Sequence, residues 1–185
     1  MIKRLIPVVL SAAASLAMGA CQMDSAKTAA PAKKPAAPDY QQALAPSPPV
    51  TNLRSICYND ADLTVIRVRM LQQEMSVLTL QCQTPSGARA LEANYATFVS
   101  KFSGDLNSNA RSLQQLAGRK RFNVDVIVTE FANRMAQRAP VDKEFCGRGQ
   151  RALEWAIDAR VTSLSQVPPP YDLGPEMKIY PCTAP

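Results

Sequence analysis

The number and spacing of the cysteines constrain this chain more than any other feature of its sequence. There are five of them, so at least one is left over if the others pair as disulfide bonds. A zinc site is disfavoured, because zinc-binding cysteines usually come in close pairs such as C-x-x-C, and the chain has no histidine. The cysteines are Cys21, Cys57, Cys82, Cys146 and Cys182.

Residues 1–20 have the organisation of an export signal. Lys3 and Arg4 form a short positive region, the run from Leu5 to Ala17 is apolar and uncharged, and small residues follow. This run is too short to span a bilayer, which needs about 20 apolar residues, and no later segment is apolar enough to do so. We therefore expect residues 1–20 to be a signal peptide and the mature protein not to be integral to the membrane.

The motif MGAC at residues 18–21 resembles the lipobox of bacterial lipoprotein precursors. The resemblance covers the signal and the motif alone, and Met18 departs from the pattern, in which leucine is usual. It implies cleavage before Cys21, whose sulfur would carry a diacylglycerol, and a protein anchored in the cell envelope that faces the periplasm. Gln22, which is not aspartate, favours the outer membrane under the enterobacterial sorting rule. The alternative is an ordinary secreted protein with an odd thiol, a liability in an oxidising compartment.

Residues 21–52 are expected to form the lipidated cysteine and a disordered tether. Ala, Pro, Lys and Ser dominate this stretch, which therefore cannot bury enough apolar surface to offset the entropy lost on ordering. A flexible chain of about 30 residues averages roughly 30 Å from end to end, so it would lift a domain off a lipid surface. The rest of the chain, residues 53–185, suffices for one compact domain.

Apolar residues recur at spacings of three and four in this domain, which predicts an all-α fold. Glycine and proline residues are expected to end the helices, with Gly118 as the stop of the second and Pro140 as the stop of the third. Gly104 is a weak point inside the second helix. The four predicted helices span residues 60–82, 86–117, 123–139 and 142–165, and their expected N-caps are Asn59 or Asp60, Asn123 and Asp142.

Short loops between four helices favour an antiparallel up-down-up-down bundle, here followed by an irregular Pro-rich tail. A first helix about 33 Å long places Cys57 and Cys82 at opposite ends, and a disulfide needs Cα atoms within about 7 Å. Following the chain through the bundle brings Cys146 to the end that holds Cys82, and Cys182 to the end that holds Cys57. The sequence therefore predicts the disulfides Cys82–Cys146 and Cys57–Cys182.

The residue types that support catalysis are few. The absence of histidine excludes imidazole acid–base chemistry, and the glycines do not follow a strand in a phosphate-loop pattern. Paired carboxylates remain the generic route, as in glycan hydrolysis, and no cofactor or metal is expected. The candidate acidic residues are Glu74, Asp125, Glu130, Glu144, Glu154 and Asp158.

Two further features are candidates for binding. The segment GRKRF places Arg119, Lys120 and Arg121 in one loop, where they could contact an anionic lipid or polymer. Asn109 lies within an apolar stripe, where it either sets the register of packing as a buried polar residue or lines a small cavity. The aromatic residues near such a cavity would be Tyr95, Phe98 and Phe102, whereas Asn133 is expected to face solvent and Gly149 to permit close helix packing.

These features favour a non-enzymatic envelope lipoprotein that binds another envelope protein or peptidoglycan. An enzyme acting on cell-wall glycan, which needs two inward-facing carboxylates in one groove, is the first alternative. A small-ligand carrier with a cavity between its helices is the second. Export to the envelope argues against nucleic acid as a partner.

Overall fold

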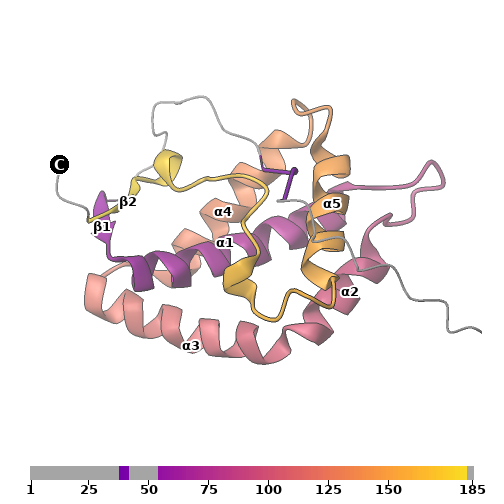
Figure 1. The fold of residues 1–185 in the computed structure, drawn as a ribbon. Coiled ribbons are helices and arrows are strands. Elements are labelled where there is room, and N and C mark those ends of the chain that lie inside the picture. Colours follow the sequence, from indigo (N-terminus) through magenta and orange to yellow (C-terminus); the bar gives the residue numbers. More distant parts are fainter. Residues whose placement is uncertain (1–37, 42–53, 183–185) are drawn as a thin grey trace, which may run out of the picture. The chain divides into compact units, whose positions relative to one another are not determined.

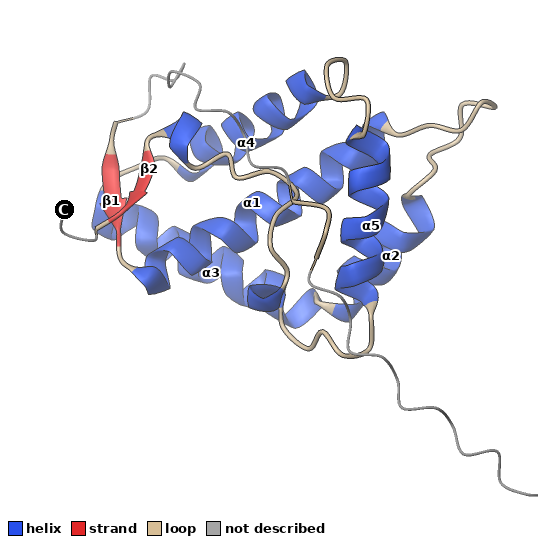
Figure 2. Cartoon of the chain, turned by 45° about the horizontal axis from the view of Figure 1, so that its top comes forward, coloured by secondary structure: helices blue, strands red, loops and turns tan. Residues whose placement is uncertain are grey.

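The computed structural model describes residues 38–41 and 54–182, which belong to one compact unit (Figures 1 and 2). The predicted signal peptide, Cys21 and most of the predicted tether lie outside these residues. The described part is mostly helical, with five α-helices, two 3₁₀ helices and a pair of short strands. In chain order the elements are β1 Ile56–Tyr58, α1 Asp60–Gln81, α2 Glu92–Lys101, α3 Ser103–Lys120, α4 Val124–Arg138, α5 Phe145–Ile157, η1 Leu164–Gln166, η2 Pro175–Met177 and β2 Ile179–Pro181.

The predicted helical fold is confirmed, but the four-helix up-down-up-down arrangement is not. The described residues contain a fifth helix and a two-stranded parallel sheet, so the fold is not strictly all-α. Helix α1 lies at the centre and packs against α3, α4 and α5 (Figure 1). Its side chains Leu71, Met75 and Leu78 are 0% exposed because other helices cover α1 on several sides. The hydrophobic core therefore surrounds this one helix.

Helices α1 and α4 begin where the sequence predicted them. The side-chain oxygen of Asn59 accepts a hydrogen bond from the Asp62 amide at 2.8 Å, and that of Asn123 accepts one from the Asp125 amide at 2.8 Å. These bonds satisfy amides that have no partner inside the first helical turn. Both predicted N-caps are thereby confirmed.

The second predicted helix is two helices in the structure. Phe102 interrupts it between α2 and α3, two positions before the weak point predicted at Gly104. Its N-terminal part, from Ser86, is instead a loop in which Gly87 has a φ of +83° and its amide bonds the Thr84 carbonyl at 2.9 Å. Gly118 does not stop α3, which runs to Lys120 and is capped by Arg121 in a left-handed conformation with φ 57°.

The fourth predicted helix is shorter than expected. Helix α5 spans Phe145–Ile157, and Asp142 lies before it as a turn residue whose carboxylate accepts a bond from the Glu144 amide at 2.8 Å. Gly149 permits close helix packing as predicted: a Cβ atom added there would lie 2.5 Å from Cδ2 of Leu78 on α1. Helices α5 and α1 therefore approach more closely than a larger residue would allow.

Both predicted disulfides are present. Cys82 and Cys146 join the end of α1 to α5 with a Cα–Cα distance of 5.6 Å. Cys57 and Cys182 have a Cα–Cα distance of 4.8 Å and join the two strands. These strands were not predicted; β1 pairs with β2 in parallel, with Ile56 opposite Ile179. The C-terminal tail, expected to be irregular, thus ends in a strand that lies beside the start of α1.

Residues 38–41, the part of the predicted tether that the structure describes, pack against the folded domain. Tyr40 is 1% exposed, and its hydroxyl donates to the Pro168 carbonyl at 3.0 Å. Its own carbonyl accepts a bond from Arg148 at 2.6 Å, while Asp39 lies 3.6 Å from Arg151 as an ion pair. One aromatic residue in a Pro- and Ala-rich stretch therefore docks against α5 and the tail.

Replacing Tyr40 with alanine should destabilise the protein strongly. A fully buried aromatic side chain is lost, which costs about 3–4 kcal/mol of the free energy of unfolding. Urea unfolding followed by circular dichroism measures this change. Asp39→Asn is the matched control, since its ion pair is largely exposed and should contribute little. An unchanged midpoint in Tyr40→Ala would show that this segment is not part of the folded unit in solution.

Candidate functional site

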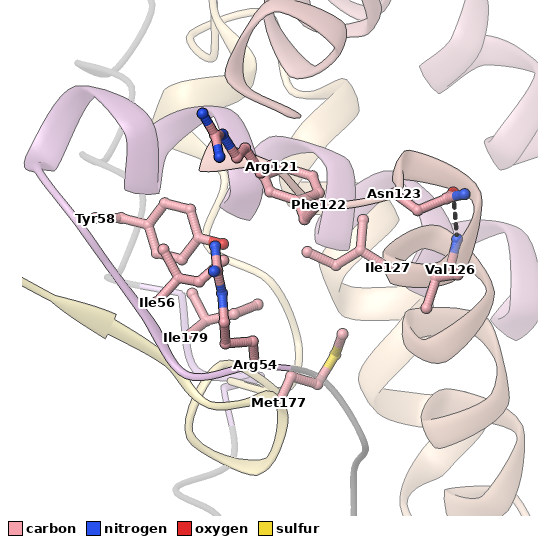
Figure 3. A pocket seen from close by; sticks show the side chains of 10 residues that line it. All are labelled: Arg54, Ile56, Tyr58, Arg121, Phe122, Asn123, Val126, Ile127, Met177 and Ile179. Atoms are coloured by element: carbon pink, nitrogen blue, oxygen red, sulfur yellow. Dashed lines mark hydrogen bonds between the residues drawn. The ribbon is translucent and has the colours of Figure 1, made fainter. Parts of the chain in front are cut away.

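The loop after α3 and the strand pair form a pocket of about 170 Å³ (Figure 3). Arg121 and Phe122 come from the loop, Ile56 and Tyr58 from β1, and Ile127 from α4. Alternation along a strand places Ile56 and Tyr58 on the same face and Cys57 on the other. The remaining lining residues are Arg54, Asn123, Val126, Met177 and Ile179.

The three cations predicted to contact an anion have different roles. Arg119 forms an ion pair with the buried carboxylate of Asp62 at 2.7 Å. Lys120 donates to the Cys57 carbonyl at 3.0 Å, and its ammonium lies 5.6 Å from the centre of the Tyr58 ring. Arg121 is exposed and makes no hydrogen bond or ion pair with the described residues. Of the three, Arg121 alone lines the pocket.

A fourth cation, which sequence reasoning missed, completes the basic rim. Arg54 lines the pocket and donates one hydrogen bond to the Lys120 carbonyl at 3.0 Å, at the end of α3. This bond uses one of the five guanidinium donors, so the others remain for a ligand. Nothing local in the sequence marks Arg54, because it lies more than 60 positions before the loop that it reaches. The pocket lining contains two guanidinium groups and no carboxylate.

Tyr58 contributes a polar group to this apolar pocket. Burial raises the pKa of its hydroxyl to about 12, with a further contribution from the nearby Asp62 carboxylate, and Arg54 opposes the shift. The phenol is therefore protonated at neutral pH and is able to donate a hydrogen bond. Among the described residues, no partner accepts a bond from this hydroxyl.

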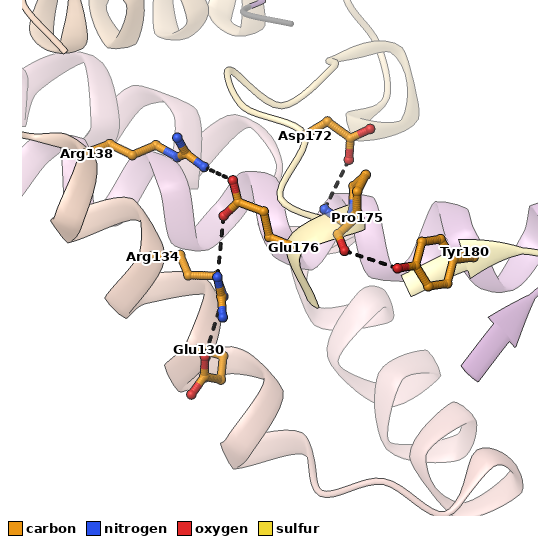
Figure 4. Close-up of polar contacts among 8 residues, drawn as sticks. Glu130, Arg134, Arg138, Asp172, Pro175, Glu176 and Tyr180 are labelled. Atoms are coloured by element: carbon orange, nitrogen blue, oxygen red, sulfur yellow. Dashed lines mark hydrogen bonds and ion pairs between the residues drawn. The ribbon is translucent and has the colours of Figure 1, made fainter. Parts of the chain in front are cut away.

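A charged cluster holds the tail against α4 and so positions the pocket (Figure 4). Glu176 of η2 is 9% exposed and pairs with Arg138 and, at 3.4 Å, with Arg134. The next residue, Met177, lines the pocket. The Tyr180 hydroxyl donates to the Pro175 carbonyl at 3.4 Å within the tail itself. Sequence reasoning missed this cluster because its partners lie some 40 positions apart.

The candidate carboxylates do not come together in a shared groove. Glu74 is 0% exposed and accepts a hydrogen bond from the Tyr171 amide at 3.1 Å. In three pockets that described residues line, Asp172 is the one carboxylate in the linings. The others have local partners or face solvent: Glu130 lies near Arg134, Glu144 near Arg151, Glu154 accepts from Gln150, Asp158 pairs with Arg160, and Asp125 is exposed.

The residues predicted to surround a ligand cavity fill the core instead. Phe98 and Phe102 are 0% and 3% exposed, with ring centroids 5.6 Å apart. Asn109 is buried and donates to the Val65 carbonyl of α1 at 2.9 Å. None of these residues lines the pocket of Figure 3 or the two other pockets described above. Asn109 therefore joins α3 to α1, as its position inside an apolar stripe suggested, and Asn133 is exposed as predicted.

Comparisons with protein-family models, with curated proteins and with solved structures each found no match. In the described ranges 38–41 and 54–182, none of the helices is long and apolar enough to cross a membrane. The same residues contain no cluster of three or more acidic, cysteine or histidine side chains that could hold a metal ion. The arrangement that remains is an apolar pocket with a basic rim.

Proposed function

We propose that this protein is a lipid-anchored binding module of the bacterial cell envelope. The signal anatomy and the MGAC motif support anchoring through Cys21 on the periplasmic side, with the outer membrane favoured by Gln22. Two disulfides among the four remaining cysteines fit an oxidising compartment. The partner is an anionic part of another envelope protein or of peptidoglycan, bound without catalysis.

The observation that carries this proposal is the pairing of two guanidinium groups with an apolar pocket that has no carboxylate in its lining. Arginine binds carboxylate and phosphate groups with two parallel hydrogen bonds, and the apolar surface nearby excludes water that would weaken them. A basic loop that only contacts solvent does not require an apolar pocket beside its arginines. Val126, which lines the pocket, is 46% exposed, so the apolar surface is open to a partner.

A photo-crosslinking amino acid at Val126 tests the proposal in bacterial cells. We expect an adduct in the envelope fraction that falls about tenfold in the double variant Arg54→Gln/Arg121→Gln, since each tenfold loss corresponds to about 1.4 kcal/mol of binding free energy. Arg111→Gln, which removes one positive charge from an exposed site on α3, should leave the adduct unchanged.

The same experiment tests anchoring with a Cys21→Ser variant. This chain should lose the acyl mass and move from the membrane fraction to the periplasmic fraction, because one thiol is the proposed attachment point. An adduct that is insensitive to both arginines would contradict the proposed binding site. A Cys21→Ser chain that stays in the membrane fraction would contradict the proposed anchor.

A further inference from the structure

The pocket between the strand pair and α4 has the size of one side chain. Its volume of about 170 Å³ is comparable to an engineered apolar protein cavity of about 150 Å³ that binds benzene. Its apolar surface comes mainly from branched and aromatic residues, namely Ile56, Phe122, Val126, Ile127 and Ile179, together with Met177. A single aliphatic or aromatic side chain would fill this space, whereas a long acyl chain would not fit.

The basic rim lies next to this apolar space. Arg54 and Arg121 both line the pocket; in Figure 3 the guanidinium of Arg54 lies beside the Tyr58 ring, and that of Arg121 lies at the edge of the pocket and points outward. Arg54 is oriented by its bond to the Lys120 carbonyl, and the left-handed backbone at Arg121 ends α3 there. A ligand must therefore present an anionic group and an apolar group within a very short distance of each other.

We propose that the pocket binds the C-terminal residue of a partner protein, with a leucine-like or phenylalanine-like side chain. This inference rests on the proposed function and names the part of the partner that is bound. In a C-terminal residue the carboxylate and the side chain leave the same Cα atom, so one residue supplies both groups. The carboxylate pairs with Arg54 and Arg121, and the side chain occupies the apolar pocket.

Other anionic groups fit the pocket less well. An internal aspartate or glutamate uses its own side chain as the anion, so the apolar space stays empty or needs a neighbouring residue. Inorganic phosphate and a lipid headgroup satisfy the arginines but leave the apolar space unfilled. The neutral Tyr58 phenol adds a hydrogen-bond donor, which suits a carboxylate with several free lone pairs.

Fluorescence anisotropy with labelled octapeptides tests this inference on the full chain in detergent. The probes are a Gly/Ser-rich peptide that ends in leucine with a free carboxylate, the same peptide as a C-terminal amide, and the same peptide ending in glycine. A fourth probe has an amide end and an internal aspartate. We expect the free leucine acid to bind at least about tenfold more tightly than each of the other three, because only it supplies both groups.

Variants of the chain connect the binding to the pocket. Arg121→Gln should weaken binding of the leucine acid about tenfold. The fold should be kept, because Arg121 is exposed and makes no hydrogen bond or ion pair with the described residues. Arg111→Gln should bind as the unmodified chain does. Equal affinity for the acid and the amide would overturn the inference.

Two further outcomes separate this inference from the proposed function. The C-terminal assignment would be overturned if the internal aspartate peptide bound more tightly than the leucine acid, in a manner that depends on Arg121. Competition by inorganic phosphate or by anionic lipid vesicles alone, also dependent on Arg121, would overturn it as well. The proposed function, a site that binds an anionic group, would still be supported. If none of these probes binds and the Val126 adduct is insensitive to the arginines, both proposals fail.

Discussion

Replacing Cys57 and Cys182 with serine lowers the free energy of unfolding by an expected 3–5 kcal/mol or so and also abolishes binding at the pocket. The two cysteines are 125 positions apart, and a disulfide that closes so long a loop removes much entropy from the unfolded chain, in the chain-entropy account. Both cysteines are exposed, so the serine hydroxyls remain solvated. The loss of stability should therefore come from the missing crosslink.

The effect on binding follows from the position of this disulfide. It holds together two three-residue strands, and a sheet this small is not stable by itself. Ile56 and Ile179, which pair across the strands, both line the pocket, as does Tyr58. Without the crosslink the pocket wall loses its fixed position, so the Val126 adduct and the binding of leucine-ended peptides should both be lost.

The Cys82–Cys146 disulfide provides the matched control. Its loop has 64 positions, half the length, and a halving changes the closure entropy by only about 0.6 kcal/mol. Cys82→Ala/Cys146→Ala should therefore lower stability by a similar amount but keep the pocket, whose lining includes neither cysteine nor any residue of α5. Urea unfolding and peptide binding, compared at a temperature where both variants are folded, measure the difference. Equal loss of binding in the two variants would show that the pocket depends on overall stability alone.

Local sequence signals identified the features that depend on neighbours in the chain. Asn59 and Asn123 predicted the starts of α1 and α4, because an N-cap needs only the residues that follow it. The disulfides were predictable because the length of α1 separates Cys57 from Cys82. That length excludes only a Cys57–Cys82 pair, and the choice between the two remaining connectivities rested on the predicted path of the chain through the bundle.

The features that were missed depend on contacts between distant residues. Gly104 indicated a weak point near the break at Phe102, but the apolar pattern did not show two helices, because Phe98, Phe102 and Leu106 keep a spacing of four across the break. The strand pair is too short to show alternation. Tyr40 lies in a stretch whose composition indicates a linker, and its burial depends on Pro168 and Arg148 far along the chain.

In the candidate site, too, some features were predictable from local sequence and others depend on contacts between distant residues. The three cations at the C-terminal end of α3 were visible as a run in the sequence, but their roles were not, and Arg119 and Lys120 lie in the last turn of the helix rather than in the predicted loop. Arg119 pairs with Asp62, and Lys120 donates to the Cys57 carbonyl of β1. Arg121 and Arg54 are therefore the candidates for binding an anion. The apolar part of the pocket comes from three separate segments of the chain, and only folding brings them together.

The second large effect concerns Glu74, a candidate catalytic acid by residue type that the structure places in the core. Burial raises its pKa well above that of an ordinary glutamate, while the bond from the Tyr171 amide and the charge of Arg138 oppose the shift. Its other carboxylate oxygen has no hydrogen-bond partner among the described residues. The folded protein therefore favours the protonated form, and the unfolded chain ionises first as the pH rises.

A raised pKa in the folded state makes stability fall with increasing pH. Below the ordinary glutamate pKa of about 4.3, Glu74 is protonated in both the folded and the unfolded state, and its contribution to the free energy of unfolding is fully present. Above it, the unfolded state loses the proton while the folded state keeps it, so stability falls by up to about 1.4 kcal/mol per pH unit until the folded pKa is passed.

Glu74→Gln removes this dependence, since the amide oxygen can still accept the Tyr171 bond and no proton is lost. Urea unfolding between pH 5 and about pH 8 should show the unmodified chain losing stability relative to Glu74→Gln, with the gap widening as the pH rises. Glu154→Gln is the control, because Glu154 is exposed and its loss should leave the two curves parallel. If the curves for the unmodified chain and Glu74→Gln are also parallel, Glu74 is ionised in the folded protein and has found a counter-charge or water that satisfies its second oxygen.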